Sequence, residues 1–140
     1  KYETLKDFIF DPKTSLSFEG ETGPYIQYSY ARLNSIIKKS RLKNPKYNSK
    51  YLTSEQESDL INHLYNFPEI IVESTNNCKP SLIARYLMDL CQKSNEFYQK
   101  CPVIDAEENL KNPRLALINS TKQVIKNCCY LLNIPLLESM

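Results

Sequence analysis

Hydrophobic residues recur along most of this chain with the period of an α-helix. In the stretch from Gly23 to Lys39 the residues that fall on one side at helical spacing are Ile26, Ser29, Leu33, Ile36 and Ile37. Pro24 fits the start of such a helix, where its missing N–H costs nothing. The pattern predicts a helix over residues 23–39 that ends before Asn44-Pro45.

Two shorter helices are expected next. Thr53 or Ser54 can cap the first of them, and acidic residues in its first turns favour the positive end of the helix dipole. Its expected buried stripe is Leu60, Ile61, Leu64 and Phe67. Pro68 should start the second, which ends by Asn76-Asn77.

The longest helix is expected from Pro80 to Cys101. Its apolar arc runs through Leu82, Ile83, Tyr86, Leu87, Leu90, Ser94, Phe97 and Cys101. On its polar side, the i,i+4 spacing predicts ion pairs Asp89–Lys93 and Glu96–Lys100. An acidic loop over 105–111 should lead to a last helix with Asn112 as its cap, Pro113 at its first position and Asn133 as its left-handed end.

Composition supports the same fold class. With 140 residues and only 2 glycines, the chain suits one helical domain more than a sheet protein. We expect an all-α bundle of about five helices over residues 23–140, preceded by a tail over residues 1–22 whose strip Phe8-Ile9-Phe10 lacks a partner. No apolar stretch approaches a membrane span and no basic-then-apolar leader opens the chain, so a soluble, cytoplasmic protein is expected.

The usual chemistry of active sites is missing from the pattern. The 5 cysteines are an odd number without C-x-x-C pairs, so reduced thiols that fill the core are expected. The single histidine, His63, is expected to be structural, and the spacings offer no metal site. No nucleotide-binding loop or nucleophile motif is present.

Charge and aromatic residues point instead to RNA. The net charge is only +2, but positive charges cluster without an acid between residues 38 and 50, as Lys38, Lys39, Arg41, Lys43, Lys46 and Lys50. This run is a solvated loop or a rim that attracts phosphate. Just before it, Tyr25, Tyr28 and Arg32 share a helical stripe beside the apolar face, which suits stacking on unpaired bases. Tyr30 and Tyr86 lie on core arcs and are expected to pack.

Three blocks of sequence resemble one family. The run Phe18-Glu19-Gly20-x-Thr22-Gly23-Pro24-Tyr25-x-Gln27-Tyr28-x-x-x-Arg32 resembles the junction in arginyl-tRNA synthetases where the catalytic domain passes into the α-helical anticodon-binding domain. Residues 80–87 with 97–104, and residues 114–117 with 124–127 and Met140, resemble later blocks of the same domain. The resemblance covers nearly the whole chain.

The resemblance implies a partner and a set of contacts. It implies that residues 1–22 are a remnant of the catalytic domain and that Tyr25 and Tyr28 contact the anticodon loop of tRNA(Arg). It also brings the end of the 80–101 helix, with Phe97 and Tyr98, and the terminal Met140 toward that loop, although Phe97 lies on the core arc. Relatives carry a basic residue where this chain has Ser139, which weakens the expectation of a phosphate contact at the terminus.

The resemblance also implies a parent enzyme that uses ATP, Mg²⁺ and L-arginine. This chain lacks the His-x-Gly-His and Lys-Met-Ser-Lys motifs of class I synthetases, so it is expected to hold no cofactor and to catalyse nothing alone, with the catalytic domain of the same polypeptide as a partner. Two alternatives stay open: the helical domain of a sibling class I synthetase such as the cysteinyl one, and a helical protein-interaction module. Binding that weakens steeply as the salt concentration rises would indicate RNA as the partner.

Overall fold

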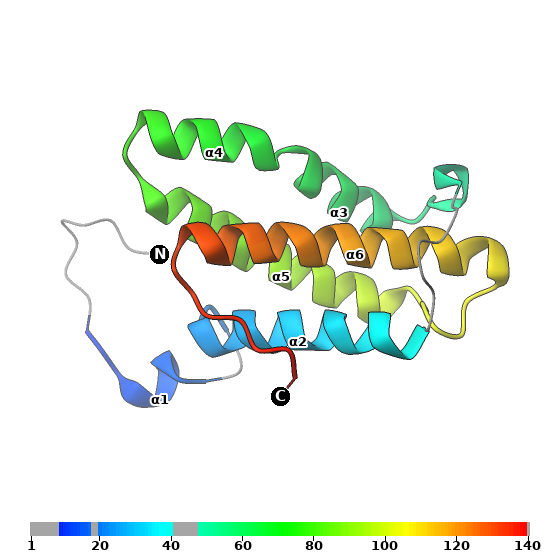
Figure 1. Cartoon of the computed structure of the whole chain (residues 1–140), viewed down its shortest axis with the longest axis horizontal. Coiled ribbons are helices and arrows are strands. Elements are labelled where there is room, and N and C mark those ends of the chain that lie inside the picture. The colour runs from blue at the N-terminus through cyan, green and yellow to red at the C-terminus, as the bar shows by residue number, and fades with distance from the viewer. Residues whose placement is uncertain (1–8, 18–19, 41–47, 140) are drawn as a thin grey trace.

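The structure is a computed structural model that describes residues 9–17, 20–40 and 48–139, and this part of the chain is helical without a strand (Figure 1). The elements are α1 (Pro12–Ser15), α2 (Gly23–Ser40), the 3₁₀ turn η1 (Ser49–Tyr51), α3 (Glu55–Tyr65), α4 (Phe67–Asn76), α5 (Pro80–Lys100) and α6 (Glu108–Leu131). The predicted all-α bundle is confirmed, with α2 to α6 as its helices.

Helix α5 is at the centre of the bundle. It packs against α2, α3, α4 and α6, and α6 lies alongside α2 (Figure 1). The predicted arc of α5 supplies the middle of the core, where Leu87, Leu90 and Phe97 have no exposed surface. Burial of such side chains contributes about 1.5–3 kcal/mol each, so α5 fixes the positions of its neighbours. Tyr30 and Tyr86 are buried as expected.

Some details of the helical pattern were predicted wrongly. The longest helix is α6, with 24 residues against 21 for α5. It starts at Glu108 and not at Pro113, because Glu107 and Glu108 suit the positive end of the dipole and Pro113, so near the start, removes only one backbone hydrogen bond. Ile61 was expected in the buried stripe but is 39% exposed, while Leu60 is buried. Lys93 was expected to pair within α5, but its Nζ lies 4.0 Å from Oδ2 of Asp59 on α3, so this ion pair joins two helices.

Two helices end in a left-handed residue that is not glycine. Asn133 has φ 54, and the N–H groups of Asn133 and Ile134 donate to the carbonyls of Tyr130 and Cys129. This Schellman arrangement confirms the predicted role of Asn133. Cys78 has φ 51 and closes α4 in the same way, with the N–H of Lys79 donating to Ser74.

A buried ion pair joins three parts of the bundle. Glu57 is 1% exposed, and its carboxylate accepts one hydrogen bond from the Ser54 N–H at 2.8 Å and one from Arg114 Nε of α6 at 2.7 Å. The Ser54 side chain in turn accepts from the Glu57 N–H, which completes a capping box at the start of α3. Arg114 also donates to the carbonyl of Pro102 at 2.7 Å, just beyond the end of α5.

The segment after α6 turns back along α2 (Figure 1). Gln27 donates to the carbonyl of Pro135 at 2.8 Å, and Asn34 donates to the carbonyl of Glu138 at 2.9 Å. Leu132, Ile134 and Leu136 pack against the core. The chain up to Glu138 is therefore held against α2.

The first described residues have little contact with the bundle. Ile9 is 97% exposed, Phe10 and Leu16 are exposed too, and α1 lies to one side of the main helices (Figure 1). Large apolar side chains in this state suit a surface that another protein segment covers.

The pH dependence of stability tests the buried pair. Burial alone would raise the pKa of Glu57, but hydrogen bonds from Ser54 and Arg114 and the charge of Arg114 hold that pKa below its ordinary value of 4.5. A depressed pKa stabilises the fold above pH 4.5, and this contribution is lost as the pH falls through the pKa of the folded state. We expect Glu57→Gln to lower the free energy of unfolding by about 1–3 kcal/mol at pH 7 and by progressively less in acid. Urea unfolding followed by circular dichroism measures both.

Glu73→Gln is the matched control, because Glu73 is an exposed residue of α4. It should leave the free energy of unfolding nearly unchanged at pH 7. A difference between Glu57→Gln and the unsubstituted chain that does not shrink in acid would contradict the assignment.

Candidate nucleic-acid interface

A threonine side chain fixes the start of α2. The Thr22 hydroxyl donates to the carbonyl of Ser17, and its oxygen accepts from the N–H of Tyr25 at 3.2 Å. Gly20 has φ 82, a backbone conformation that side chains rarely adopt. Tyr25, whose N–H donates to this cap, is the first aromatic residue of the predicted stripe. The cap therefore also sets where that stripe begins.

The predicted stripe lies on the side of α2 that faces α5 and solvent. Tyr28 is 40% exposed, whereas Tyr25 and Arg32 are half-buried. Lys39 is exposed and continues the stripe at helical spacing, two turns after Arg32. Tyr25 was expected to lie largely off the apolar face, but its ring packs against the core, so only Tyr28 has the free surface of a stacking platform.

Two side chains of α5 contact the stripe and restrain it. Asn95 Nδ2 donates to Tyr25 Oη at 2.7 Å, and the Tyr98 ring lies 4.6 Å from the Arg32 guanidinium carbon. The second contact is a cation–π interaction, which restrains Arg32 while leaving its N–H groups free to donate. We call these six residues the α2–α5 face: Tyr25, Tyr28, Arg32 and Lys39 of α2, with Asn95 and Tyr98 of α5.

The tyrosine of the Asn95 hydrogen bond stays protonated at neutral pH. Burial raises the pKa of Tyr25 above its ordinary value, although the hydrogen bond from Asn95 opposes the shift. The face therefore carries the positive charges of Arg32 and Lys39 and no negative charge of its own. Neutral aromatic rings beside cations are what single-stranded RNA sites use.

Phe97 has no place in the interface. Its exposed fraction is 0%, because it points into the core between α5 and its neighbours. A ring without exposed surface cannot stack on a base, so its inclusion among the predicted contact residues was wrong. The neighbouring Tyr98 is half-buried and carries the contact on that part of α5.

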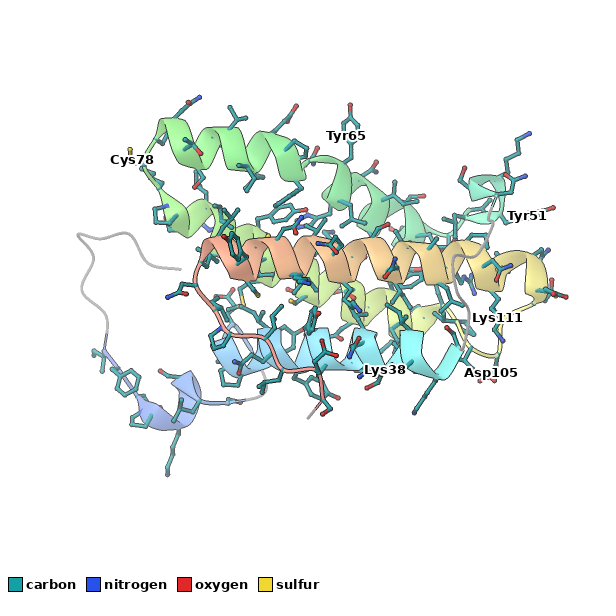
Figure 2. All side chains as sticks on the ribbon, viewed as in Figure 1. Lys38, Tyr51, Tyr65, Cys78, Asp105 and Lys111 are labelled. Carbon is teal, nitrogen blue, oxygen red and sulfur yellow. The ribbon has the colours of Figure 1, made fainter. Side chains whose placement is uncertain are left out.

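The basic cluster is only partly described. Lys38 lies on α2 (Figure 2), and its Nζ is 3.4 Å from Glu138 Oε2 in the segment after α6. Arg41, Lys43, Lys46 and the terminal Met140 lie outside the described residues. Lys39 is thus the exposed cation of this cluster that the structure places on the α2–α5 face.

Asn95 was not predicted from the sequence. The signal that could have found it is its spacing, because Asn95 lies three residues before Tyr98 and so shares its side of the helix. The sequence shows which residues share a side of α5, but the crossing of α2 over α5 is needed to place Asn95 at Tyr25.

His63 and the buried cysteines have structural roles. His63 stacks on Tyr86 with ring centroids 4.3 Å apart and hydrogen-bonds to its carbonyl at 3.1 Å, which agrees with the expected structural role. Cys91, Cys101, Cys128 and Cys129 are buried, and burial raises the pKa of Cys129 to about 11. Among the described residues no cluster of His, Cys, Asp and Glu could hold a metal ion. Nor has any helix in that part of the chain the length and apolar content needed to cross a bilayer.

Comparisons with known proteins agree on one family. The sequence pattern of the "DALR anticodon binding domain" matches residues 26–140. The chain is 43% identical over 136 residues to an arginine–tRNA ligase of Clostridium botulinum and 44% identical over 138 residues to one of Clostridium acetobutylicum. In both cases 96% of this chain is covered, but the chain spans only 24% of the relative's length.

Solved structures give the same result. The arginyl-tRNA synthetase of Thermus thermophilus superposes with a TM-score of 0.83 at 34% identity, covering 89% of this chain and 22% of that one. The arginyl-tRNA synthetase of Plasmodium falciparum also has a TM-score of 0.83, at 30% identity, covering 96% of this chain and 24% of that one. In sequence and in fold alike, this chain belongs to the DALR anticodon-binding domain family.

Proposed function

We propose that this chain is the anticodon-binding domain of an arginine–tRNA ligase and that its α2–α5 face holds the anticodon loop of tRNA(Arg). One observation carries the proposal: Tyr28 is exposed beside Arg32, and Arg32 is itself restrained by Tyr98. The relatives' names supply the enzyme, and the family supplies the kind of nucleic acid.

The face suits an unpaired loop of RNA. A base that leaves the loop's own stack can lie on the Tyr28 ring, and such stacking is worth ~1–3 kcal/mol per base. Arg32 can donate to a phosphate or to a base edge while its other side stays on Tyr98. Lys39 adds positive charge further along α2.

The domain contributes position and specificity. As proposed, the parent enzyme would use ATP with Mg²⁺ to attach L-arginine to tRNA(Arg) in the cytoplasm, at a catalytic domain on the same polypeptide. Residues 1–22 would be a remnant of the end of that domain. The exposed Ile9 and Phe10 support this, because they lack a covering partner here. Holding the loop would fix the orientation of the whole tRNA, so that its acceptor end is already positioned at the catalytic domain.

Replacing Tyr28 by alanine tests the stacking platform. We expect Tyr28→Ala to weaken binding of tRNA(Arg) by ~1–3 kcal/mol, because one stacking ring is removed. The free energy of unfolding should fall by less than about 1 kcal/mol, because the ring is 40% exposed. Fluorescence anisotropy and urea unfolding on the same sample measure the two quantities.

Tyr65→Ala is the matched control for this change. Tyr65 is 81% exposed and points away from the bundle on the α3–α4 side (Figure 2). It should bind tRNA(Arg) as the unsubstituted chain does. Arg32→Lys should weaken binding, because an ammonium cannot both stack on Tyr98 and fork to RNA. Equal effects of Tyr28→Ala and Tyr65→Ala would contradict the proposed face.

The two adjacent lysines should differ in their contribution to the salt dependence. Lys39→Gln should flatten the slope of log K against log salt by about 0.7 to 0.9, the value expected when one lysine no longer neutralises a phosphate. Lys38→Gln should change the slope less, because Glu138 already pairs with Lys38. Titrations at several salt concentrations measure both slopes. A larger change of slope with Lys38→Gln than with Lys39→Gln would contradict the proposal that Lys39 contacts the phosphate.

A further inference from the structure

Charge is divided unevenly between the two sides of the bundle. Helix α2 has no acidic residue, and α6 has none after Glu108, its first residue. Lys38 of α2 and Lys122 and Lys126 of α6 are basic residues of these two neighbouring helices (Figure 1). Helices α3 and α4, in contrast, contain acidic residues and neither lysine nor arginine. The α2–α6 side therefore attracts a polyanion, and the α3–α4 side repels one.

A buried amide on the α2–α6 side has a fixed direction. Asn34 is 4% exposed, and its Oδ1 accepts a hydrogen bond from Lys122 Nζ at 3.0 Å. Because an ammonium group can only donate, this contact leaves the Asn34 NH₂ group to face the segment after α6. The Lys122 ammonium is itself held by the Tyr30 ring, whose centroid lies 5.8 Å away. The protein thus presents an oriented hydrogen-bond donor beside two lysines.

The carboxylate of Glu138 occupies the position to which these donors point. Its Oε2 accepts from Asn34 Nδ2 at 3.2 Å and from Lys38 Nζ at 3.4 Å. The hydrogen bonds from Asn34 and Lys38, with the charges of Lys38 and Lys122, hold the pKa of Glu138 below its ordinary value. The side chain is nevertheless 73% exposed, so the carboxylate can exchange with another anion.

The segment after α6 stays in place without this carboxylate. The backbone carbonyl of Glu138 accepts from Asn34 Nδ2 at 2.9 Å, and Gln27 binds the carbonyl of Pro135. Leu132, Ile134 and Leu136 pack against the core. The Glu138 side chain can therefore turn to solvent while the backbone remains on α2.

From this geometry we infer that Asn34 and Lys38 form a binding site for a phosphate group of the RNA backbone, and that the carboxylate of Glu138 is its internal competitor. Side-chain amides and ammonium groups are common phosphate contacts in nucleic-acid complexes. Lys38 and Lys39 are adjacent at the end of α2, so a strand that passes Lys39 reaches Lys38 by crossing this end. The inference rests on the proposed function, because the phosphate belongs to the tRNA bound on the α2–α5 face.

Glu138→Gln tests the competition. The substitution frees Lys38, which then attracts a counterion from solution that RNA releases on binding. We expect tRNA(Arg) to bind about two- to five-fold more tightly, the factor that corresponds to one exposed ion pair. The slope of log K against log salt should become steeper by about 0.7 to 0.9.

Glu73→Gln is the matched control for the change of net charge. It removes the same charge from an exposed residue of α4, on the opposite side of the bundle. Its effects on affinity and on the salt slope should be clearly smaller. Equal effects of Glu138→Gln and Glu73→Gln would overturn the inference.

A double-mutant cycle with Lys38 separates a direct contact from a general charge effect. In the unsubstituted chain Lys38→Gln should change the salt slope little, because the displaced Glu138 takes up a counterion of its own. In the Glu138→Gln chain the same substitution should flatten the slope by about 0.7 to 0.9 and weaken binding about two- to five-fold. Identical effects of Lys38→Gln in the two chains would overturn the inference.

The side-chain amide of Asn34 reports on the site without any substitution. In the ¹⁵N-labelled chain its NH₂ resonances should move when tRNA(Arg) binds, whereas those of Asn62, exposed on α3, should not. Inorganic phosphate at the same ionic strength is the second ligand. A shift with inorganic phosphate and none with tRNA(Arg) would assign the site to the free ion and overturn the inference.

The outcomes distinguish this site from the proposed function. Weaker binding with Tyr28→Ala, together with unmoved Asn34 NH₂ resonances, would remove only the phosphate site. Failure of both the unsubstituted chain and the Glu138→Gln chain to bind tRNA(Arg) would remove the proposed function, and the inference with it. Glu138 is exposed, so its substitution removes no core packing, and urea unfolding verifies the fold.

Discussion

The carboxylate of Glu57 is the group on which the arrangement of the helices depends. It is buried, yet charged, because Ser54 and Arg114 satisfy its two oxygens at 2.8 and 2.7 Å. Through Arg114 it reaches the carbonyl of Pro102, so the start of α3, the end of α5 and the start of α6 are joined by one group. Removing one partner of this pair lowers the free energy of unfolding, because the other charge is left without its counterion in the interior.

The α2–α5 face follows from how α5 is held. One side of α5 is committed to the core through Leu87, Leu90 and Phe97, which leaves Asn95 and Tyr98 toward α2. Each then meets a side chain of α2: Asn95 meets Tyr25, and Tyr98 meets Arg32. The face is thus restrained before RNA binds, so less conformational entropy is lost on binding than with free side chains.

The sequence predicted the fold well because helical periodicity, caps and prolines are local signals. Ser54, Pro80 and Asn133 all have the roles expected of them. The helix start predicted from Pro113 was wrong, because a proline at the first position of a helix and a proline within a helix give the same sequence signal. The acidic residues before Pro113 are what indicate the earlier start. The pattern placed Tyr28 on an exposed side of α2, but it could not show that Tyr25 packs against the core or that Phe97 is enclosed. Nor could it show that Asn95 and Lys38 have partners on other segments. Such contacts depend on helix crossings, which periodicity does not encode.

The central claim is that RNA binds where α2 crosses α5. Titration of the ¹⁵N-labelled chain with tRNA(Arg), followed by amide chemical shifts, tests this most directly. The largest changes should fall on α2 from Tyr25 to Lys39 and on residues 92–98 of α5, while the amides of α4 stay unperturbed. Changes centred on the α3–α4 side around Tyr65, or no saturable change at low salt, would contradict the account.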